Sequence, residues 1–250
     1  MKISACIPCY NSSRTIGEAI ASVRAQSRPV DELFVVDNHS SDGSRECVAS
    51  LGVRMIEQRE NKGRGASRAL AMETAAHELV LFCDSAIVLD PAFVENALPW
   101  FDDPNVAAVF GWVAQPPPQN AVERWRGRHL FKSPPASAGR RAMLATGGAL
   151  LRASAVKAAG GFDPALIHCE DADLGARLLA AGRDMVLDPK LRLLSISQNN
   201  LPQVLERYWR WNSAPHGRIG AAAYLRQIVY SARVMALEDL RARDPAAALI

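Results

Sequence analysis

Residues 33–43 of the chain read LFVVDNHSSDG. The four apolar residues have the length of a short strand that is buried on both faces, and the polar stretch that begins at Asp37 has the composition of a turn. Residues 3–8, with the sequence ISACIP, have the same character. Between these two runs, apolar residues recur at helical spacing at Ile16, Ala19, Ile20 and Val23. A strand, a helix and a strand in this order predict two parallel strands that are joined by a right-handed crossover.

The same alternation continues through the first hundred residues. Thr15 and Glu18 match a capping box at the start of the first helix. Further helices are predicted at 44–51, at 63–76 and from Pro91, and further strands at 53–56, 79–83 and 106–110. We therefore predict an α/β fold with a mostly parallel, Rossmann-like sheet and helices on both of its faces.

The second half of the chain has a weaker pattern. Residues 112–141 are rich in proline, arginine and tryptophan and lack a clear period, which is typical of a functional loop. Strands are predicted at 143–151, 185–187 and 191–196, helices at 154–159 and 170–181, and the last fifty residues have a helical pattern. These predictions divide the chain into an α/β domain at 1–198 and a helical C-terminal appendage at 199–250 that packs on it.

The composition excludes several classes of protein. The chain has 250 residues, of which 49% are hydrophobic and 22% charged, as is typical of a globular protein with a sizeable core. A formal net charge of +3 is too small to indicate a nucleic-acid partner. No apolar run approaches the roughly 20 residues that a membrane span needs, and the first residues lead directly into a strand. We therefore expect neither a transmembrane helix nor a signal peptide.

The five cysteines do not resemble a disulfide framework, which favours a reducing compartment and hence the cytoplasm. Cys6 and Cys9 form a C-x-x-C pattern, but side chains three residues apart on a strand point to opposite faces of the sheet. We therefore expect two buried cysteines rather than a shared metal or a redox pair.

Polar residues follow the predicted strands at the points where those strands end: Tyr10, Asn11, Asp37, Asp84 and Ser85. In open α/β sheets, ligands bind at the carboxyl ends of the strands, so these residues and Pro8 are expected at one binding edge. The Asp37 and Asp84 carboxylates can accept hydrogen bonds from a uracil-type imide or from ribose hydroxyls. Each aspartate taken singly fits a turn cap equally well. Together at one edge they favour a nucleotide site.

Residues 63–65, Gly-Arg-Gly, open a predicted helix. The third glycine of a dinucleotide fingerprint would fall at Arg68, so that motif fails. The alternative is that these residues begin a helix whose first backbone amides, together with the side chains of Arg64 and Arg68, bind an anion such as a diphosphate. An exposed basic helix face fits the same residues.

Residues 168–173, His-Cys-Glu-Asp-Ala-Asp, place three carboxylates at a helix start. Negative charge is favourable at a helix N-terminus, so the cluster fits a purely structural cap. Crowded carboxylates also raise one another's basicity, so the cluster fits a general base equally well.

Several short motifs occur in a fixed order along the chain: Ile7–Asn11, Val35–Ser44, Asn61–Gly63 with Ser67-Arg68, Leu81–Ala86, Gly147–Arg152 with Gly160–Asp163, and Glu170–Leu174, which matches E-D-x-D-L. In this order they resemble the motifs of the family-2 inverting glycosyltransferases, which have the glycosyltransferase A fold. The resemblance spans roughly residues 2–195.

The resemblance implies roles for individual residues. Asp171 is the base that deprotonates the acceptor, Glu170 supports it, and Asp173 belongs to the same motif. By the resemblance Asp37, Arg68 and Asp84 contact the nucleotide, and Gly148 belongs to the strand that cradles the donor. Pro8, Tyr10 and Ser85 complete the expected donor site because they lie at the same sheet edge. Trp209, in the C-terminal region, either stacks on sugar or acceptor or packs in the structure.

Two departures from the family pattern concern the divalent cation, Mg²⁺ or Mn²⁺, that the resemblance implies. Ala86 replaces the second aspartate of the D-x-D motif, and Ser197-Gln198 stands where many relatives carry a metal-binding histidine. Asp84 is then the remaining protein ligand at most. Arginines are the alternative means of neutralising the diphosphate: Arg64, Arg68, those of the 124–141 loop, Arg207 and Arg210. No other cofactor is expected.

The expected activity is inverting transfer of a sugar from a nucleoside-diphosphate sugar to a glycan, lipid-linked or protein acceptor. A catalytically inert relative that binds nucleotide or glycan as a scaffold is the first alternative, which Ala86 and the missing histidine favour. A nucleotide-dependent oxidoreductase is the second, and the failed glycine fingerprint weakens it. The aromatic and cationic residues 207–211, with Arg218, Arg226 and Arg233, also fit a helix that rests on a membrane surface.

Overall fold

The computed structural model describes residues 1–132, 137–212 and 220–250. The chain forms two compact units. Unit 1 consists of Met1–Val113 and Pro135–Ser197, and unit 2 consists of Ala114–Pro134 and Gln198–Ile250. One division between the units lies between Ser197 and Gln198, one residue before the predicted boundary, and the segment that begins at Ala114 groups with the C-terminal helices and not with unit 1. The division into two domains stays a prediction.

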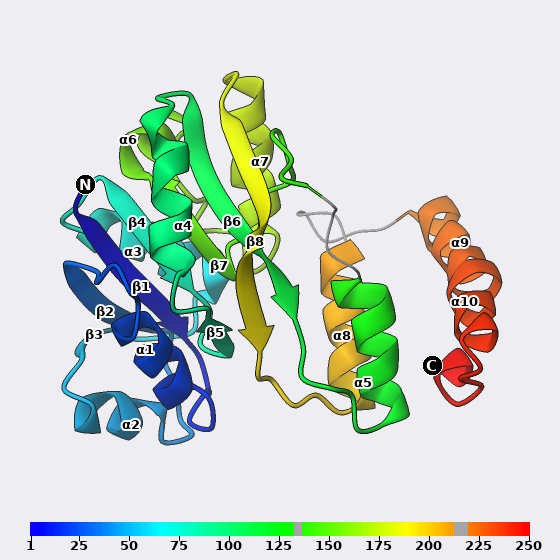
Figure 1. Ribbon diagram of the computed structural model, residues 1–250. Helices are drawn as coiled ribbons and strands as arrows, with labels where there is room; N and C mark the ends of the chain where they lie inside the picture. Colours follow the sequence, from blue (N-terminus) through cyan, green and yellow to red (C-terminus); the bar gives the residue numbers. More distant parts are fainter. Residues whose placement is uncertain (133–136, 213–219) are drawn as a thin grey trace. The chain divides into compact units, whose positions relative to one another are not determined.

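Unit 1 is built on one sheet, which has eight strands among the described residues in the order β3-β2-β1-β4-β7-β6-β8-β5 (Figure 1). The strands are β1 Ile3–Cys9, β2 Glu32–Asp37, β3 Arg54–Glu57, β4 Leu79–Cys83, β5 Ile87–Leu89, β6 Val106–Ala114, β7 Gly148–Arg152 and β8 Asp184–Ser195. The helices of this unit are α1 Ile16–Arg24, α2 Ser44–Ser50, α3 Gly63–Thr74, α4 Phe93–Ala97, the 3-10 helix η1 Leu98–Asp102, α6 Ala153–Ala158 and α7 Glu170–Ala180.

The first half of the sheet is parallel, as the strand–helix alternation predicts. β1 pairs in parallel with both β2 and β4, and β2 pairs in parallel with β3. The second half brings antiparallel pairs, because β7 runs against both β4 and β6, and β5 runs against β8. The result is a mixed α/β sheet.

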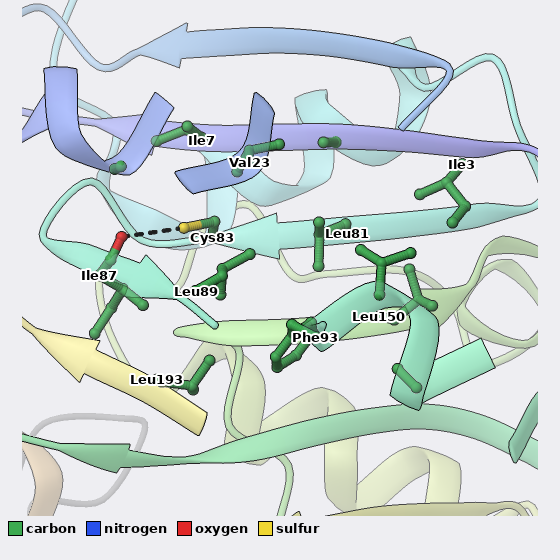
Figure 2. Packing of buried hydrophobic residues seen from close by; sticks show 14 of the residues in the cluster. Ile3, Ile7, Val23, Leu81, Cys83, Ile87, Leu89, Phe93, Leu150 and Leu193 are labelled. Atoms are coloured by element: carbon green, nitrogen blue, oxygen red, sulfur yellow. Dashed lines mark hydrogen bonds between the residues drawn. The ribbon is translucent and has the colours of Figure 1, made fainter. Parts of the chain in front are cut away.

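Helices cover both faces of this sheet, which confirms the predicted fold class. One core cluster contains side chains of α1, α2 and α4 (Figure 2), in which Val23, Leu81 and Phe93 come from α1, β4 and α4. The other cluster contains side chains of α3, α6 and α7. Cys9 belongs to the first cluster and Cys6 to the second, so the two cysteines are buried on opposite faces as predicted.

Several local predictions differ from the structure. Thr15 makes no side-chain cap to the α1 backbone, because its hydroxyl instead donates to the Ser12 carbonyl oxygen. The two predicted strands at 185–187 and 191–196 are one twelve-residue strand, β8, and β7 begins only at Gly148. Strand β5 was not predicted, since its three residues are too short to show a period.

Unit 2 is helical. Its helices are α5 Ala121–Arg126, the π-helix η2 Gly127–Phe131, α8 Leu201–Asn212, α9 Ala221–Tyr230, the π-helix η3 Ser231–Met235, α10 Ala236–Arg241 and the 3-10 helix η4 Ala247–Leu249. A small core of Trp125, Val204, Met235 and Ala247 joins them. The segment predicted as a 112–141 loop is therefore partly helical, because its apolar residues pack against the distant C-terminal helices.

Arg218 lies outside the described residues. No helix in the described part of the chain combines the length and apolar character that crossing a membrane requires.

Candidate active site

Hydroxyl groups hold together the loops that follow β1, β2 and β4. The amide of Asn11 donates to Ser40 Oγ at 2.9 Å, and the amide of Ser12 donates to Ser44 Oγ at 2.7 Å. The hydroxyls of Ser12 and Ser85 lie 2.7 Å apart. These contacts gather the polar residues after the three strands at one edge of the sheet. Ser12, Ser40 and Ser44 were not predicted as site residues, because a serine in a turn has no distinctive sequence signal.

Asp37, the last residue of β2, is fully buried at this edge. Its Oδ2 accepts hydrogen bonds from the Ser40 amide at 3.0 Å and from Arg45 Nε at 2.8 Å. Its Oδ1 is buried and has no hydrogen-bond partner within the described residues. One carboxylate oxygen therefore holds the turn, and the other can still accept a hydrogen bond from a ligand. Asp37 can therefore both cap the turn after β2 and bind a ligand, the two functions considered from the sequence.

Pro8 and Tyr10 flank the end of β1. Pro8 pairs with Val36 of β2, and the Tyr10 side chain is half-exposed. Cys9, which lies between them, pairs with Asp37 itself, so Pro8 and Tyr10 flank the residue opposite Asp37.

Arg68 lies at the centre of a buried group of charges. Its Nη2 donates to Asp84 Oδ1 at 2.7 Å, and its Nη1 contacts Glu170 Oε1. The side chain is only 2% exposed, although it sits in α3 and its partners follow β4 and begin α7. Arg68 was predicted to contact the nucleotide, and the structure places its guanidinium between two carboxylates of the predicted site.

The turn after β4 is held firmly in place. The Asp84 amide donates to the Gly147 carbonyl oxygen at 2.8 Å, and the Cys83 thiol donates to the Ile87 carbonyl oxygen at 3.4 Å (Figure 2). Gly148 is buried, and a Cβ at this position would lie 2.4 Å from Leu193 Cδ2. Close packing on β8 is therefore sufficient to explain this glycine.

The three carboxylates at the start of α7 have different surroundings. Burial raises the pKa of Glu170, an effect that the positive charge of Arg68 opposes. Asp173 receives a hydrogen bond from Arg177 Nε at 3.1 Å. Asp171 is half-buried and has no ion pair among the described residues; Thr146 Oγ1 donates to it at 3.5 Å. Thr146 was not predicted, and only the fold brings it beside the cluster.

The glycines at the start of α3 serve packing. The Arg64 and Gly65 amides donate to the carbonyl oxygens of Ile167 and Leu166, at 3.2 and 3.0 Å. A Cβ at Gly65 would lie 2.2 Å from the Asp163 carbonyl oxygen. The hypothesis that these amides bind an anion is therefore wrong, because they are already used by the loop that precedes α7. The Arg64 side chain is exposed, and its charge acts on Glu170.

The family model described as Glycosyl transferase family 2 matches residues 4–158. The chain belongs to this family. Its match to the hyaluronan synthase of Streptococcus pyogenes is 31% identical over 121 residues, 44% of this chain and 29% of that protein. An uncharacterized glycosyltransferase of a Nostoc species is 31% identical over 114 residues, 44% of this chain and 35% of that protein. The matches thus span about a third of each of these curated relatives.

Solved structures of glycosyltransferases share the fold. S. aureus TarS 1-349 in complex with UDP-GlcNAc has a TM-score of 0.66 and 18% identity, and the match covers 100% of this chain and 80% of that chain. The mannosyltransferase PcManGT of Pyrobaculum calidifontis, solved with GDP-Man and Mn²⁺, has a TM-score of 0.62 and 17% identity, and the match covers 99% of this chain and 74% of that chain. These likenesses confirm the glycosyltransferase A type of fold.

A divalent cation is plausible for a family-2 protein, since one such structural neighbour was solved with Mn²⁺. The residues of this chain do not fit a cation held by several side chains. The Ala86 carbonyl oxygen accepts a hydrogen bond from the Ile196 amide at 3.0 Å, so the alanine and the strand end before Ser197-Gln198 lie together. Both positions lack a carboxylate or imidazole, and Asp84 is ion-paired with Arg68. Within the described residues, no group of three His, Cys, Asp or Glu side chains could hold a metal ion.

Four of the five arginines in the 124–141 segment of this family-2 chain have partners elsewhere, and the fifth, Arg141, is exposed. Arg124 and Arg128 pair with Asp244 in unit 2, and Arg140 pairs with Asp103 and Asp184 in unit 1. Arg126 donates to Gln115 Oε1 at 2.9 Å. These four side chains stabilise their own units, and the hypothesis that this segment closes over the donor stays a prediction.

Unit 2 holds Trp209, whose ring is half-exposed and contacts the Tyr224 ring with centroids 6.2 Å apart. The contact favours packing within unit 2 for this tryptophan. A cavity of about 700 Å³ in the same unit is lined by other residues, among them Lys132, Trp211 and Tyr230. It contains none of the predicted site residues.

Proposed function

We propose that this chain is an inverting glycosyltransferase that moves a sugar from a nucleoside-diphosphate sugar to an acceptor hydroxyl, with Asp171 as the base. One observation carries the assignment of the base. Of the three carboxylates at the start of α7, Glu170 is paired with Arg68 and Asp173 with Arg177, while Asp171 has no ion pair among the described residues. A carboxylate without a paired cation retains its capacity to accept a proton.

The proposed reaction is a direct displacement at the anomeric carbon. Asp171 takes the proton of the acceptor hydroxyl while that oxygen attacks, and the nucleoside diphosphate leaves from the opposite face of the sugar with inversion of the stereocentre. Glu170, buried and held by Arg68, fixes the start of α7 and with it the position of Asp171.

The proposed donor site is the sheet edge formed by Pro8, Tyr10, Asp37, Asp84 and Ser85. The unpartnered Oδ1 of Asp37 is suited to accept a hydrogen bond from the imide of the base. Arg64 is exposed beside Glu170 and has no ion pair among the described residues, so we assign it to the leaving diphosphate. We propose a glycan, lipid-linked or protein acceptor, and we propose the cytoplasm as the location of the reaction.

Titration calorimetry with a panel of nucleoside diphosphates tests the donor site. The chain is expected to bind at least one of them, and Asp37→Ala and Arg64→Ala are expected to weaken that binding by roughly tenfold each. Lys157→Ala, an exposed change in α6, is the matched control and leaves the affinity unchanged. Unaltered affinity in both site variants would contradict the proposed position of the nucleotide.

A catalytically inert relative that binds a nucleotide or glycan is the second candidate. The specific observation in its favour is that Ala86, whose carbonyl oxygen accepts a hydrogen bond from the Ile196 amide, and Ser197-Gln198, which follow Ile196, both lack the metal ligands of the family. Nucleotide binding without either transfer to any acceptor or slow hydrolysis of the donor sugar would favour this candidate over an enzyme.

A further inference from the structure

The C-terminal helix of unit 2 has an inverted distribution of side chains. Helices α9, η3 and α10 follow one another without a break from residue 221 to residue 241 (Figure 1). The side that packs on the rest of unit 2 carries one buried apolar side chain, Met235, together with polar side chains. Gln227 donates to the Tyr208 hydroxyl at 2.6 Å, and Asp239, which is fully buried, lies 3.0 Å from His129 Nε2.

The large apolar side chains of this helix are exposed instead. Their exposed fractions lie between 44% and 61% for Tyr224, Leu225, Ile228, Val229, Tyr230, Val234, Leu237 and Leu240. A surface helix of a globular protein normally buries its apolar stripe and exposes its polar face. An exposed apolar surface of this extent indicates a site of contact with another protein or with a membrane.

The charge of unit 2 indicates what kind of partner this apolar surface contacts. Arg226, Arg233 and Arg241 are exposed on the same helix. The sequence of unit 2 contains eleven lysines and arginines against five aspartates and glutamates, a net charge of +6 in a chain whose total is +3. A second copy of the chain would bring more arginines to this surface, whereas the phosphates of anionic lipids neutralise those already there.

Aromatic side chains complete the pattern. Trp209 of α8 contacts Tyr224 of α9, and both rings are about half-exposed. Half-exposed aromatic rings beside arginines and aliphatic side chains are characteristic of segments that lie in the interface between acyl chains and headgroups.

We propose that residues 221–241 form a bilayer-binding surface that lies flat on a membrane rich in anionic lipid. Leu225, Val229 and Leu240 enter the acyl boundary, and Arg226 and Arg233 contact lipid phosphates. The helix rests on the membrane instead of crossing it, which agrees with the charged residues along its length. This surface is independent of the proposed transfer reaction, because it needs neither donor nor Asp171.

Flotation of the full chain with vesicles tests the proposal. The chain is expected to float with vesicles that contain phosphatidylglycerol at low salt, and much less with vesicles of phosphatidylcholine alone. The double variant Leu225→Ser with Val229→Ser removes apolar contacts and is expected to lower the partition coefficient by roughly tenfold or more. Arg226→Glu with Arg233→Glu is expected to lower it by at least about tenfold.

Matched changes in unit 1 serve as controls. Met143→Ser alters another exposed apolar side chain, and Lys2→Glu with Lys157→Glu reverses two other exposed cations. These variants are expected to bind vesicles as the unaltered chain does. Nucleotide calorimetry on every variant separates a failure of this surface from a failure of the donor site.

Three results would overturn the proposal. The first is no flotation with anionic vesicles at low salt, and the second is equal flotation of the arginine variant and its lysine control. The third is a chain that forms a stable dimer in light scattering but does not bind vesicles, and whose dimer is dissociated by the double variant Leu225→Ser with Val229→Ser. That result would assign the surface to a second copy of the chain.

Discussion

Arg68 Nη2 lies 2.7 Å from Asp84 Oδ1, and the same guanidinium contacts Glu170, which is 102 residues away in the sequence. One buried cation therefore joins the turn after β4 to the first residue of α7. This contact links the proposed donor edge of the sheet to the helix that begins with Glu170 and the proposed base, Asp171. We therefore propose that Arg68 is a positioning residue, which acts on the site through Asp84 and Glu170, and its predicted contact with the nucleotide stays a prediction.

Replacement of Arg68 by alanine is expected to lower the free energy of unfolding by about 3–5 kcal/mol, because it leaves Glu170 buried without a partner cation. Urea denaturation followed by circular dichroism measures the change. Arg68→Lys keeps the charge but loses the forked geometry, so an intermediate loss is expected. An unfolding midpoint of Arg68→Ala equal to that of the unaltered chain would show that the ion pairs contribute nothing.

Asp171→Asn is expected to leave the fold and nucleotide affinity intact and to reduce turnover by roughly 10²–10⁴, since the amide cannot accept the acceptor proton. Release of nucleoside diphosphate measures turnover. Asp173→Asn is the matched control, because it alters a neighbouring carboxylate that is already paired with Arg177, and a smaller loss is expected. Near-normal turnover in Asp171→Asn would move the role of base to Asp173 or Glu170, or remove it.

The response to metal depends on Ala86. With alanine here and Ser197-Gln198 beyond β8, few protein ligands remain for a divalent ion, so EDTA is expected to change nucleotide affinity little. Ala86→Asp is expected to make the affinity depend on Mn²⁺, as titration calorimetry with and without the ion would show. Ala86→Asn, which adds a neutral side chain of similar size, is the control. A nucleotide complex in which two or more side chains of the unaltered chain hold Mn²⁺ would contradict this prediction.

Acid is expected to destabilise unit 2 through Asp244. Hydrogen bonds from Arg124 and Arg128 hold the pKa of this carboxyl well below its ordinary value of 3.8. A depressed pKa in the folded state stabilises the fold above the unfolded value, and this contribution is lost as the pH falls. Asp244→Asn should therefore lower the unfolding temperature of unit 2 at neutral pH, and the difference should narrow below about pH 4.

Calorimetric scans over a pH series measure this difference. Asp103→Asn removes a comparable carboxyl partner of Arg140 in unit 1 and should leave the transition of unit 2 unchanged. A difference between Asp244→Asn and the unaltered chain that is constant with pH would rule out the titration of Asp244 as its cause.

The local sequence was sufficient to predict the strands in the parallel half of the sheet. Strands β1, β2 and β4 appear as short apolar runs, and Asp37 and Asp84 follow two of them at the positions where a strand end must lie. Burial on both faces requires such runs, so the pattern reports the structure directly. The Glu170–Leu174 motif was also readable, because it is contiguous in the sequence.

Only the tertiary structure decided the remaining features. The partner of Arg68, the engagement of the Arg64 and Gly65 amides by the 163–167 loop, and the pairing of Arg124 with Asp244 all join segments far apart in the chain. A periodic pattern reports burial at each position but not which distant group a buried cation or amide meets. That choice follows from how the elements pack, because a buried polar group must find its partner wherever the fold places one.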